Sequence, residues 1–382
     1  MTQKIKDIHF MEEGEGRIVL FYPFIPSKAK EYVCDSLDSR WVGQGPKVDQ
    51  FENDFTRFIG SSHHPIAVGS GTDALHLSYI LSDISPGDEV VAPLFTCTAT
   101  NIPFLNMGAK IRFADVQPDT LNIDPNHVRT LMTSKTKAIV CVHYGGLPCD
   151  MTELRAIADE WGVPIIEDAA HAVGATYKGQ SIGDISEYTM FSFQAIKHLT
   201  TSDGGMLMLK DQSQIEKAKR IRWFGIDRSA KQGGIWENDI VEVGYKYQMT
   251  DIAAAMGLAA LEELQGALDH RIRLFNAYKE GLSGIDGVTF LDGDRSDRTH
   301  AAWLCTILTD YGNDLQKMLA ENNIESNQVH FRNDRYSIFK EFTQNCEFPG
   351  MDSVEDRYLV LPLHTKVSEE DVQKICSLIR QG

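Results

Sequence analysis

The stretch MFSFQAIKHLTTSDGGMLML, residues 190–209, holds a single lysine between two apolar runs. The run that ends in Phe193 and the run at 206–209 predict two strands joined by a tight polar loop. Lys197 lies in that loop, where burial would disfavour its ammonium form and lower its pKa. A neutral amine can attack an aldehyde, and pyridoxal 5'-phosphate (PLP) is the aldehyde cofactor that such a lysine serves. Lys197 is therefore a candidate catalytic residue, although a surface lysine in a hairpin would give the same pattern.

The same stretch resembles a known family. FSFQAIKHLTTSDGG, residues 191–205, resembles the lysine segment of the DegT/DnrJ/EryC1/StrS family of sugar aminotransferases, written FSF-x-x-x-K-x-x-x-x-x-[DE]-G-G. The match holds at every fixed position, and it implies that Lys197 binds PLP covalently and that Ser192 lies against the cofactor. In a related branch, the PLP-dependent sugar dehydratases, a histidine stands at the lysine position. Lys197 therefore favours the aminotransferase branch.

The composition is that of an ordinary globular protein with an acidic surface. Its 382 residues are 42% apolar and 24% charged, and the formal net charge is -17. A charge of this sign argues against nucleic acid or an anionic membrane as a partner. Residues 1–17 lack the apolar segment of a signal peptide, and no run of about 18 apolar residues occurs. We therefore expect a cytoplasmic protein that neither is exported nor spans a membrane.

The seven cysteines are odd in number and scattered along the chain without a CxxC pair. This spacing indicates neither a disulfide framework nor a zinc site. We therefore predict reduced thiols and no metal.

A glycine-rich turn predicts a phosphate site. Residues 64–68 read as a short buried strand, and the turn GSGT, residues 69–72, leads into a helix. Because backbone N–H groups at a helix N-terminus bind phosphate, Gly71 and Thr72 are candidate cofactor-binding residues. The pattern is also G-x-G-x-x-A, which is typical of dinucleotide folds. That alternative needs an acidic residue at the far end of the next strand, but residues 90–93 are followed by LFT.

Alternating strand and helix patterns predict a parallel sheet with ligands at the carboxyl ends of its strands. Apolar runs at 111–114, 138–142 and 163–166 are the expected strands. Asp168 follows the last of these runs. PLP chemistry needs a carboxylate that keeps the pyridine nitrogen protonated, and Asp168 is placed for that role. A helix cap would use an aspartate at the same place.

The surrounding residues add to the resemblance. EDAAHAVG, residues 167–174, resembles the family segment E-D-A-A-[QH]-A-x-G. This similarity implies that Asp168 contacts the pyridine nitrogen and that His171 lies near the ring hydroxyl. His143 begins HYGG, which resembles the family's H-x-x-G segment near the cofactor; a hydrogen-bonded loop histidine is the alternative.

Two segments depart from the family at expected cofactor positions. PLFTCTAT, residues 93–100, resembles P-x-x-T-[FY]-x-A-T, but Cys97 replaces the aromatic residue that stacks on PLP. Either Phe95 leans across the ring or the ring is held more by its phosphate. GYKYQMTD, residues 244–251, resembles G-Y-N-x-R-M-[TS]-[DE], which reaches the cofactor phosphate of the opposite subunit. Lys246 replaces the asparagine and Gln248 the arginine, and we expect Lys246 to bind the phosphate.

Two further stretches are candidates for substrate binding. WVGQGP, residues 41–46, lies between two amphipathic helices and resembles the family's W-x-x-x-G-P segment at the sugar-nucleotide site, which implies that Trp41 contacts substrate. Chain reversal alone would also explain this turn. QVHFRNDR, residues 328–335, concentrates cations in an acidic protein. Because the family closes its site with this region, we expect His330, Arg332 and Asn333 to contact substrate; a solvated loop is the alternative.

The rest of the chain predicts a second, smaller domain. A long helix around 261–280 leads to strands at 288–293 and 301–309 and to helices at 312–322 and 369–381. We therefore divide the chain into a large PLP-binding domain, residues 1–262, and a small α+β domain, residues 263–382. The resemblance implies the α/β fold of fold type I PLP enzymes, which is aspartate-aminotransferase-like, with a mostly parallel seven-stranded sheet.

The resemblance also implies an activity. It predicts an aminotransferase that converts a nucleotide-linked keto-deoxysugar to an amino sugar with L-glutamate as donor, in amino sugar or polysaccharide biosynthesis. It further predicts a homodimer with shared active sites. Two alternatives stay open: a PLP-dependent dehydratase, which should lack the lysine, and a sensor that binds PLP without turnover. No DNA-binding segment is visible to support the sensor.

Overall fold

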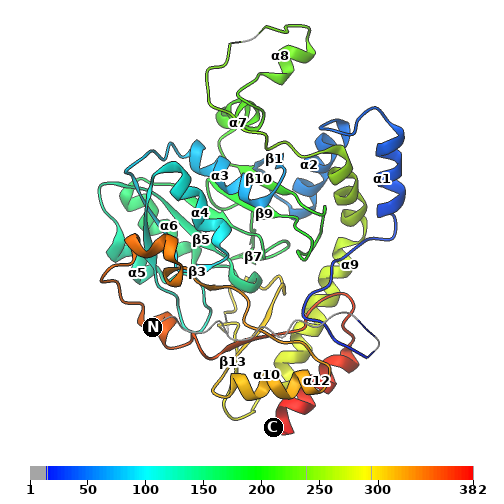
Figure 1. The fold of residues 1–382 in the computed structure, drawn as a ribbon, viewed down its shortest axis with the longest axis vertical. Coiled ribbons are helices and arrows are strands. Elements are labelled where there is room, and N and C mark those ends of the chain that lie inside the picture. Colours follow the sequence, from blue (N-terminus) through cyan, green and yellow to red (C-terminus); the bar gives the residue numbers. More distant parts are fainter. Residues whose placement is uncertain (1–13, 15, 238, 294, 382) are drawn as a thin grey trace.

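A seven-stranded sheet forms the centre of the computed structural model, which describes residues 14 and 16–381 except 238 and 294 (Figure 1). Its strands are β1 (His64–Val68), β2 (Glu89–Pro93), β4 (Lys110–Ala114), β5 (Thr136–Val142), β6 (Ile165–Asp168), β9 (Tyr188–Ser192) and β10 (Gly205–Leu209). Their order is β1-β10-β9-β6-β5-β2-β4, and β10 runs antiparallel to both of its neighbours. The other pairs are parallel. The predicted mostly parallel seven-stranded sheet is therefore confirmed.

Helices cover both faces of the sheet. Successive residues of a strand point to opposite faces, so each strand contributes side chains to two cores. Val90 and Ala92 of β2 belong to one core and Val91 belongs to the other. The first core includes residues of α3 (Gly71–Leu81), α4 (Thr98–Met107) and α7 (Ile215–Arg222). The second includes residues of α2 (Pro46–Ile59), α5 (Pro125–Leu131), α6 (Met151–Trp161) and α9 (Asp251–Gly281). Burial on both faces is the usual state of a parallel sheet.

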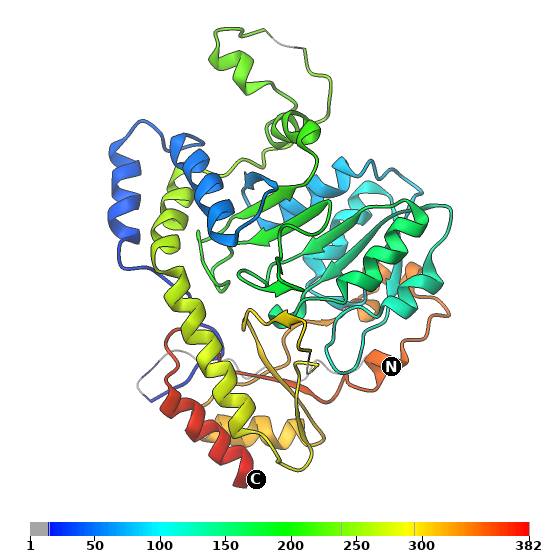
Figure 2. The same ribbon diagram turned by 180° about the vertical axis from the view of Figure 1, so that it is seen from behind.

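One long helix, α9, connects the sheet to the C-terminal part of the chain (Figure 2). It runs for 31 residues and begins at Asp251 rather than near residue 261, because the Thr250 hydroxyl caps it by accepting the Ala253 N–H. Its small residues allow close packing: a Cβ on Gly257 would lie 2.6 Å from the Phe51 ring. The predicted domain boundary at residues 262 and 263 falls inside this helix, and the division stays a prediction.

The C-terminal part builds its own core around the end of α9. β11 (Val288–Phe290), β13 (Cys305–Thr309) and β15 (Tyr358–Leu361) form an antiparallel sheet in the order β11-β13-β15. α10 (Gly312–Glu321) and α12 (Glu369–Gln381) pack with this sheet against Leu274, Phe275 and Tyr278 of α9. This arrangement agrees with the predicted α+β character of the region.

Residues 301–304 are a loop, although the sequence predicts that they begin a strand. Ala302 has a φ of 53°. The backbone N–H groups of Ala301, Trp303 and Leu304 donate to carbonyl oxygens of Gly145 and Gly146. These hydrogen bonds hold the loop against the turn that follows β5, and they bring Trp303 to the end of the large sheet.

Short elements complete the fold. They are α1 (Ala29–Asp38), β3 (Phe95–Thr96), η1 (Tyr144–Gly146), β7 (Thr176–Tyr177), β8 (Gln180–Ser181), η2 (Gln212–Gln214), α8 (Arg228–Gln232), β12 (Arg298–Thr299), β14 (Phe331–Arg332), η3 (Asn333–Arg335), η4 (Ser337–Phe342) and α11 (Pro349–Asp352). β14 pairs with β3, and β12 pairs with β7. Within the described ranges, no helix has the length and apolar character needed to cross a membrane.

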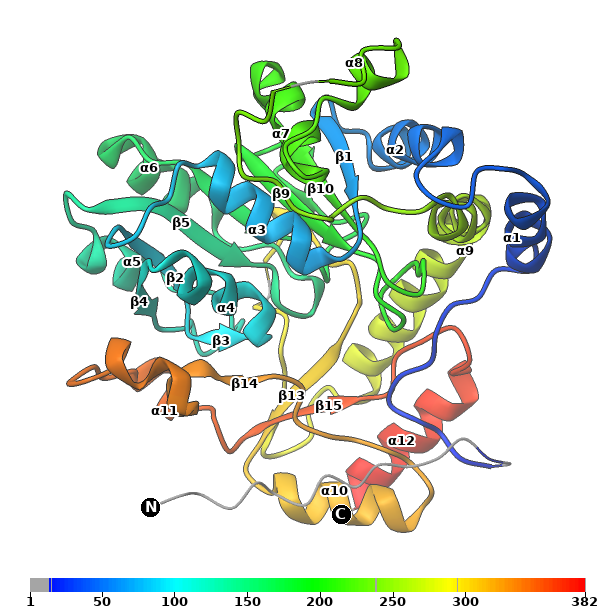
Figure 3. The ribbon, with the colours of Figure 1, turned by 45° about the horizontal axis from the view of Figure 1, so that its top comes forward.

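An arm, defined as residues 223–237 and 239–243, projects from the body beyond α7 and carries α8 (Figures 1 and 3). Several of its large apolar side chains are exposed, including Trp236 at 76% and Val243 at 80%. Exposed apolar side chains are gathered in this segment more densely than on most of the protein surface.

Candidate active site

Lys197 lies in the loop between β9 and β10. The loop is closed at its base by Phe193, whose N–H donates to Gly204 and whose carbonyl accepts from Thr201. The Lys197 side chain is half-buried, and its Nζ lies 3.9 Å from the centre of the Trp303 ring. Burial lowers the pKa of Lys197 to about 8, against the opposing effect of Asp168. The structure therefore supplies an amine that is easily deprotonated, as the sequence predicts.

Asp168 is the last residue of β6 and is 5% exposed. Its Oδ2 accepts a 2.8 Å hydrogen bond from the Thr100 hydroxyl, and its Oδ1 accepts one of 3.1 Å from the Ala170 N–H. Burial raises the pKa of Asp168, whereas these two hydrogen bonds and the charge of Lys197 lower it. A buried, oriented carboxylate therefore lies near Lys197, where it could pair with a protonated pyridine nitrogen.

The first turn of α3 forms a cup with the ends of β9 and β10. Ser70 caps the helix by accepting the Asp73 N–H at 3.0 Å. A Cβ on Gly71 would lie 2.9 Å from Ser192 Cβ, and a Cβ on Gly205 would lie 2.5 Å from the Ser70 carbonyl oxygen. Gly71 thus allows Ser192 to approach the first turn of the helix, and Gly205 allows β10 to approach the Ser70 backbone. Gly71 and Ser192 are therefore brought together at the N-terminus of α3, where Thr72 is the next residue, and a phosphate site here stays a prediction.

Three aromatic rings lie parallel beside Lys197. The His171 ring stacks on the Trp303 ring with centroids 3.8 Å apart and planes inclined by 8°. The His330 ring lies 5.3 Å from His171 at 12°. Burial lowers the pKa of both histidines, to about 3 for His330, and the Lys197 charge adds to the effect. Both rings are therefore neutral at pH 7.

His171 also offers a free polar atom. It is 3% exposed, and its Nδ1 has no hydrogen-bond partner in the described part of the chain. An unsatisfied buried nitrogen is costly unless a ligand completes it. A cofactor hydroxyl would do so, in agreement with the predicted place of His171 near the ring hydroxyl of PLP.

Cys97 is exposed at the N-cap of α4, and its proximity contributes to the pKa of Lys197. Phe95 does not cover the place that an aromatic residue would fill there. It is 1% exposed, and its ring packs against Tyr144 at 5.1 Å and Tyr358 at 5.2 Å. The alternative in which Phe95 leans across the cofactor is therefore wrong, because its ring is part of the core.

The structure corrects the expected role of two residues in the 328–335 stretch. Arg332 is 4% exposed, and its guanidinium bonds to Asp334, Asp352 and Glu355. Asn333 is fully buried and donates to the Thr96 carbonyl at 2.8 Å. Because their polar groups are engaged within the protein, both residues shape the loop rather than face a substrate.

His330 differs from its two neighbours. Its φ is 68°, which turns the backbone so that the ring joins the aromatic group beside Lys197. Its Nε2 is buried without a hydrogen-bond partner among the described residues. Of the three predicted substrate residues in this stretch, His330 is the one that lies near Lys197 with a free nitrogen.

The side chains of Trp41 and Lys246 make other contacts in the single chain. Trp41 lines a cavity of about 560 Å³ together with Gln44, Trp223 and Arg228, and none of the residues around Lys197 contributes to it. Lys246 is exposed, and its Nζ lies 5.6 Å from the centre of the Phe224 ring on the arm. The cavity next to Trp41 is therefore separate from the residues around Lys197. The segment that carries Lys246 runs beside the α3 turn of its own chain, where the Gly69 N–H donates to the Tyr247 carbonyl at 2.6 Å, but the Lys246 side chain itself points to the arm.

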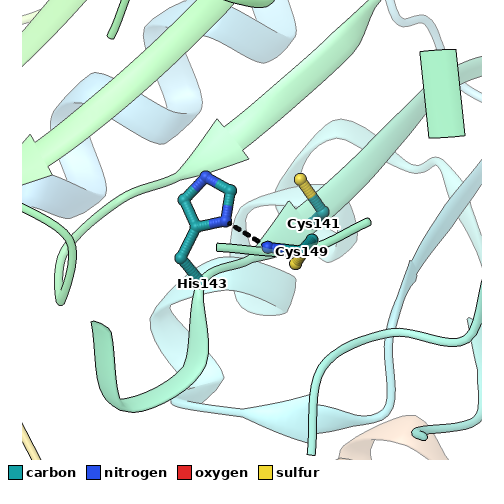
Figure 4. Close-up of side chains that lie close together, drawn as sticks. All are labelled: Cys141, His143 and Cys149. Atoms are coloured by element: carbon teal, nitrogen blue, oxygen red, sulfur yellow. Dashed lines mark hydrogen bonds between the residues drawn. The ribbon is translucent and has the colours of Figure 1, made fainter. Parts of the chain in front are cut away.

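His143 belongs to a buried cluster with Cys141 and Cys149, whose potential ligand atoms lie within 4.8 Å of one another (Figure 4). All three side chains lie in the interior. His143 Nδ1 accepts the Cys149 N–H at 3.1 Å, and its Nε2 is 2.8 Å from Glu167 Oε2. Burial lowers the pKa of His143, but its bonds to Cys149 and Glu167 outweigh this effect and raise it to about 10. The cluster therefore reads as a hydrogen-bonded support for the turn after β5.

The residues around Lys197 fit PLP. The cup suits the phosphate, Asp168 suits the pyridine nitrogen, and the free Nδ1 of His171 suits the ring hydroxyl. The sequence does not point to Trp303, because the segment AAWLC is typical of a strand and lies outside every segment that resembles the family. An isolated tryptophan in a predicted strand gives no signal that it borders a site.

Comparison with known proteins agrees with this geometry. Residues 24–380 match the DegT/DnrJ/EryC1/StrS aminotransferase family. The chain is 35% identical over 370 residues to the spore coat polysaccharide biosynthesis protein SpsC of Bacillus subtilis, covering 94% of this chain and 95% of SpsC. It is 32% identical over 370 residues to the GDP-perosamine synthase of Escherichia coli O157:H7, covering 95% of this chain and 98% of that protein.

Solved structures support the same assignment. The sugar aminotransferase CalS13 from Micromonospora echinospora has a TM-score of 0.90 and 31% identity, covering 96% of this chain and 100% of CalS13. The PLP form of Spr1654 from Streptococcus pneumoniae has a TM-score of 0.87 and 29% identity, covering 96% of this chain and 98% of that one. The chain therefore belongs to the DegT/DnrJ/EryC1/StrS family and is a PLP-dependent aminotransferase.

Proposed function

We propose that the enzyme transfers an amino group from L-glutamate to a nucleotide-linked keto-deoxysugar and so forms an amino sugar for polysaccharide biosynthesis. The observation that carries the proposal is the grouping of Lys197, Asp168 and the α3 cup at one end of the sheet. The similarity to a GDP-perosamine synthase supports a sugar substrate that carries a nucleotide, and the similarity to SpsC supports a place in polysaccharide biosynthesis.

Each residue of the group has a separate task in this proposal. Gly71, Thr72 and Ser192 would hold the cofactor phosphate, and Asp168 would keep the ring nitrogen protonated. PLP supplies the electron sink that no side chain offers. In each half-reaction the Lys197 amine would act as the general base that removes a proton and then, as the ammonium, as the general acid that delivers one, which its pKa of about 8 permits near neutral pH.

The enzyme is proposed to act as a homodimer with shared active sites. The exposed apolar side chains of the arm would be covered by a second copy of the chain. In this arrangement Lys246 would reach the phosphate of the opposite subunit, and the cavity next to Trp41 would lie at the nucleotide end of the substrate.

A cytoplasmic location is part of the proposal. All seven cysteines are free, as expected for a protein kept in a reducing compartment. Nucleotide-linked sugars made in the same compartment would be the available substrates.

The test is a panel of nucleotide-linked keto-sugars, varied in base and in the position of the keto group, incubated with enzyme, PLP and L-glutamate. We expect one member to give an amino sugar with an equal amount of 2-oxoglutarate. A product that lacks an oxygen and contains no new nitrogen would favour the dehydratase alternative. PLP binding without turnover of any member would favour the sensor alternative.

A further inference from the structure

Trp303 contacts Lys197 in two ways. The Lys197 Nζ lies 3.9 Å from the centre of the indole ring. The indole Nε1–H donates a 3.0 Å hydrogen bond to the carbonyl of Ile196, the residue before the lysine. One side chain therefore touches both the reactive amine and the peptide that carries it.

The indole is held firmly in this position. Trp303 is 2% exposed, and its ring packs in parallel with His171 at 3.8 Å and with Phe21 at 5.8 Å. Its backbone N–H donates to the Gly145 carbonyl at 3.0 Å. A rotation of the side chain would break the stack and the bond to Ile196, so the ring is a fixed surface for the amine.

The two contacts have distinct physical effects. An aromatic face attracts an ammonium group, and the attraction is greater when water is excluded. Burial acts in the opposite direction and disfavours the ammonium form. The lysine side chain is flexible, so an amine released from the cofactor loses its alignment unless a neighbour restrains it.

We propose that Trp303 is a positioning residue for Lys197: its ring face holds the amine, and its N–H fixes the preceding peptide, whenever the lysine is not bonded to the cofactor. The inference rests on the proposed role of Lys197 as the cofactor lysine. Trp303, a residue of the C-terminal part of the chain, thereby takes part in the reaction and does more than pack against His171.

Two substitutions separate the contacts. Trp303→Phe retains a ring face but removes the N–H donor, whereas Trp303→Leu removes both. Phe21→Leu is the matched control, because Phe21 packs in the same stack. Thermal unfolding of all three variants reports how much each change disturbs the fold.

The first measurement uses the apoenzyme. Lys197 is titrated by its rate of reaction with an amine reagent such as trinitrobenzenesulfonate, followed by peptide mass spectrometry at a series of pH values. We expect a midpoint of about 8 in the unchanged protein. Loss of the ring removes an attraction for the ammonium form, so the midpoint falls by about one pH unit in Trp303→Leu. It stays near the original value in Trp303→Phe and in Phe21→Leu.

The second measurement uses the holoenzyme in a single turnover with glutamate. We expect Trp303→Leu to slow the step about tenfold while the dissociation constant of glutamate is unchanged. The single-turnover rate of Trp303→Phe should lie between those of Trp303→Leu and the original protein, because Trp303→Phe keeps a ring face but loses the hydrogen bond to Ile196. Equal titration midpoints in all proteins, or equal effects of Trp303→Leu and Phe21→Leu, would overturn the inference. Attachment of PLP to a different lysine would instead overturn the proposed function, and the Lys197 titration would still be readable.

Discussion

The hydroxyl of Thr100 donates a 2.8 Å hydrogen bond to Asp168 Oδ2 at the buried end of β6. Thr100 is fully buried and lies 2.9 Å, hydroxyl to hydroxyl, from Thr96. The bond lowers the pKa of Asp168, while burial raises it. Thr100 therefore orients the carboxylate and helps it to stay ionised where the cofactor nitrogen would lie.

Replacing Asp168 with asparagine should leave PLP bound but slow the half-reaction with glutamate by several orders of magnitude. The lost ion pair to the ring nitrogen removes several kcal/mol of transition-state stabilisation, and about 1.4 kcal/mol corresponds to tenfold in rate. Thr100→Val is the matched control. It keeps the Asp168 carboxylate, so the rate of the half-reaction should fall by about tenfold or less. Stopped-flow absorbance measures both rates. A near-normal rate for Asp168→Asn would show that Asp168 does not pair with the ring nitrogen.

Gly71→Ala should weaken PLP binding by about tenfold or more, which corresponds to about 1.4 kcal/mol. The added Cβ would lie 2.9 Å from Ser192 Cβ and 3.1 Å from its Oγ, so the cup must open. Gly266→Ala in α9 is the control, because a Cβ there meets nothing within 4 Å. Equilibrium dialysis of the apoenzymes against PLP gives the two affinities. Unchanged affinity in Gly71→Ala would place the phosphate somewhere else.

Lys246→Asn should weaken PLP retention more than Cys97→Ser does, and the loss should increase with salt. The reason is that a lysine from the second subunit would hold the phosphate by charge, which salt screens. Cys97 would cover little of the ring. Retention is measured as PLP lost during gel filtration at low and high salt. A larger loss in Cys97→Ser would show that contact with the ring matters more than charge.

Mixed dimers test the shared site directly. A Lys197→Ala chain combined with a Lys246→Glu chain should regain one functional site, because that site takes its lysine from one chain and its phosphate ligand from the other. Each parent should be inactive alone. Activity is compared in dimers purified with two different affinity tags. Failure to recover activity in verified mixed dimers would assign Lys246 to its own subunit or to no site.

The sequence was informative where the site depends on short segments at strand ends. Asp168 ends an apolar run, and Gly71 and Lys197 lie three and five residues after the strands β1 and β9, so each run indicates which end of the sheet the residue occupies. Parallel strands bring such ends together, so grouping of these residues could be predicted without knowledge of the side-chain packing.

The sequence was less informative where a residue's role depends on partners far along the chain. Arg332 stands in a cationic stretch, but its partners Asp352 and Glu355 lie on or after α11 and neutralise it. Trp303 is placed by hydrogen bonds between its loop and Gly145, more than one hundred residues earlier. Both contacts arise from tertiary packing between distant segments, so neither produces a recognisable pattern in the nearby sequence.

The start of α9 illustrates a third limit. Residues 252–261 are small and apolar, so they show little of the alternation that marks a helix with one exposed face. This part of the helix packs between α1 and α2 (Figure 3), and a Cβ on Gly257 would collide with the Phe51 ring. A helix segment without a polar face lacks the amphipathic pattern, so the sequence predicts a helix that begins later than α9 does.

The most direct test of the account is to locate the lysine that holds PLP. Sodium borohydride reduces the carbon–nitrogen double bond between the cofactor and its lysine to a stable single bond, and peptide mass spectrometry then identifies the modified residue. We predict that PLP-saturated enzyme is yellow, that the reagent abolishes its absorbance band, and that the adduct maps to Lys197. A band that persists, or an adduct on any other lysine, would contradict the account.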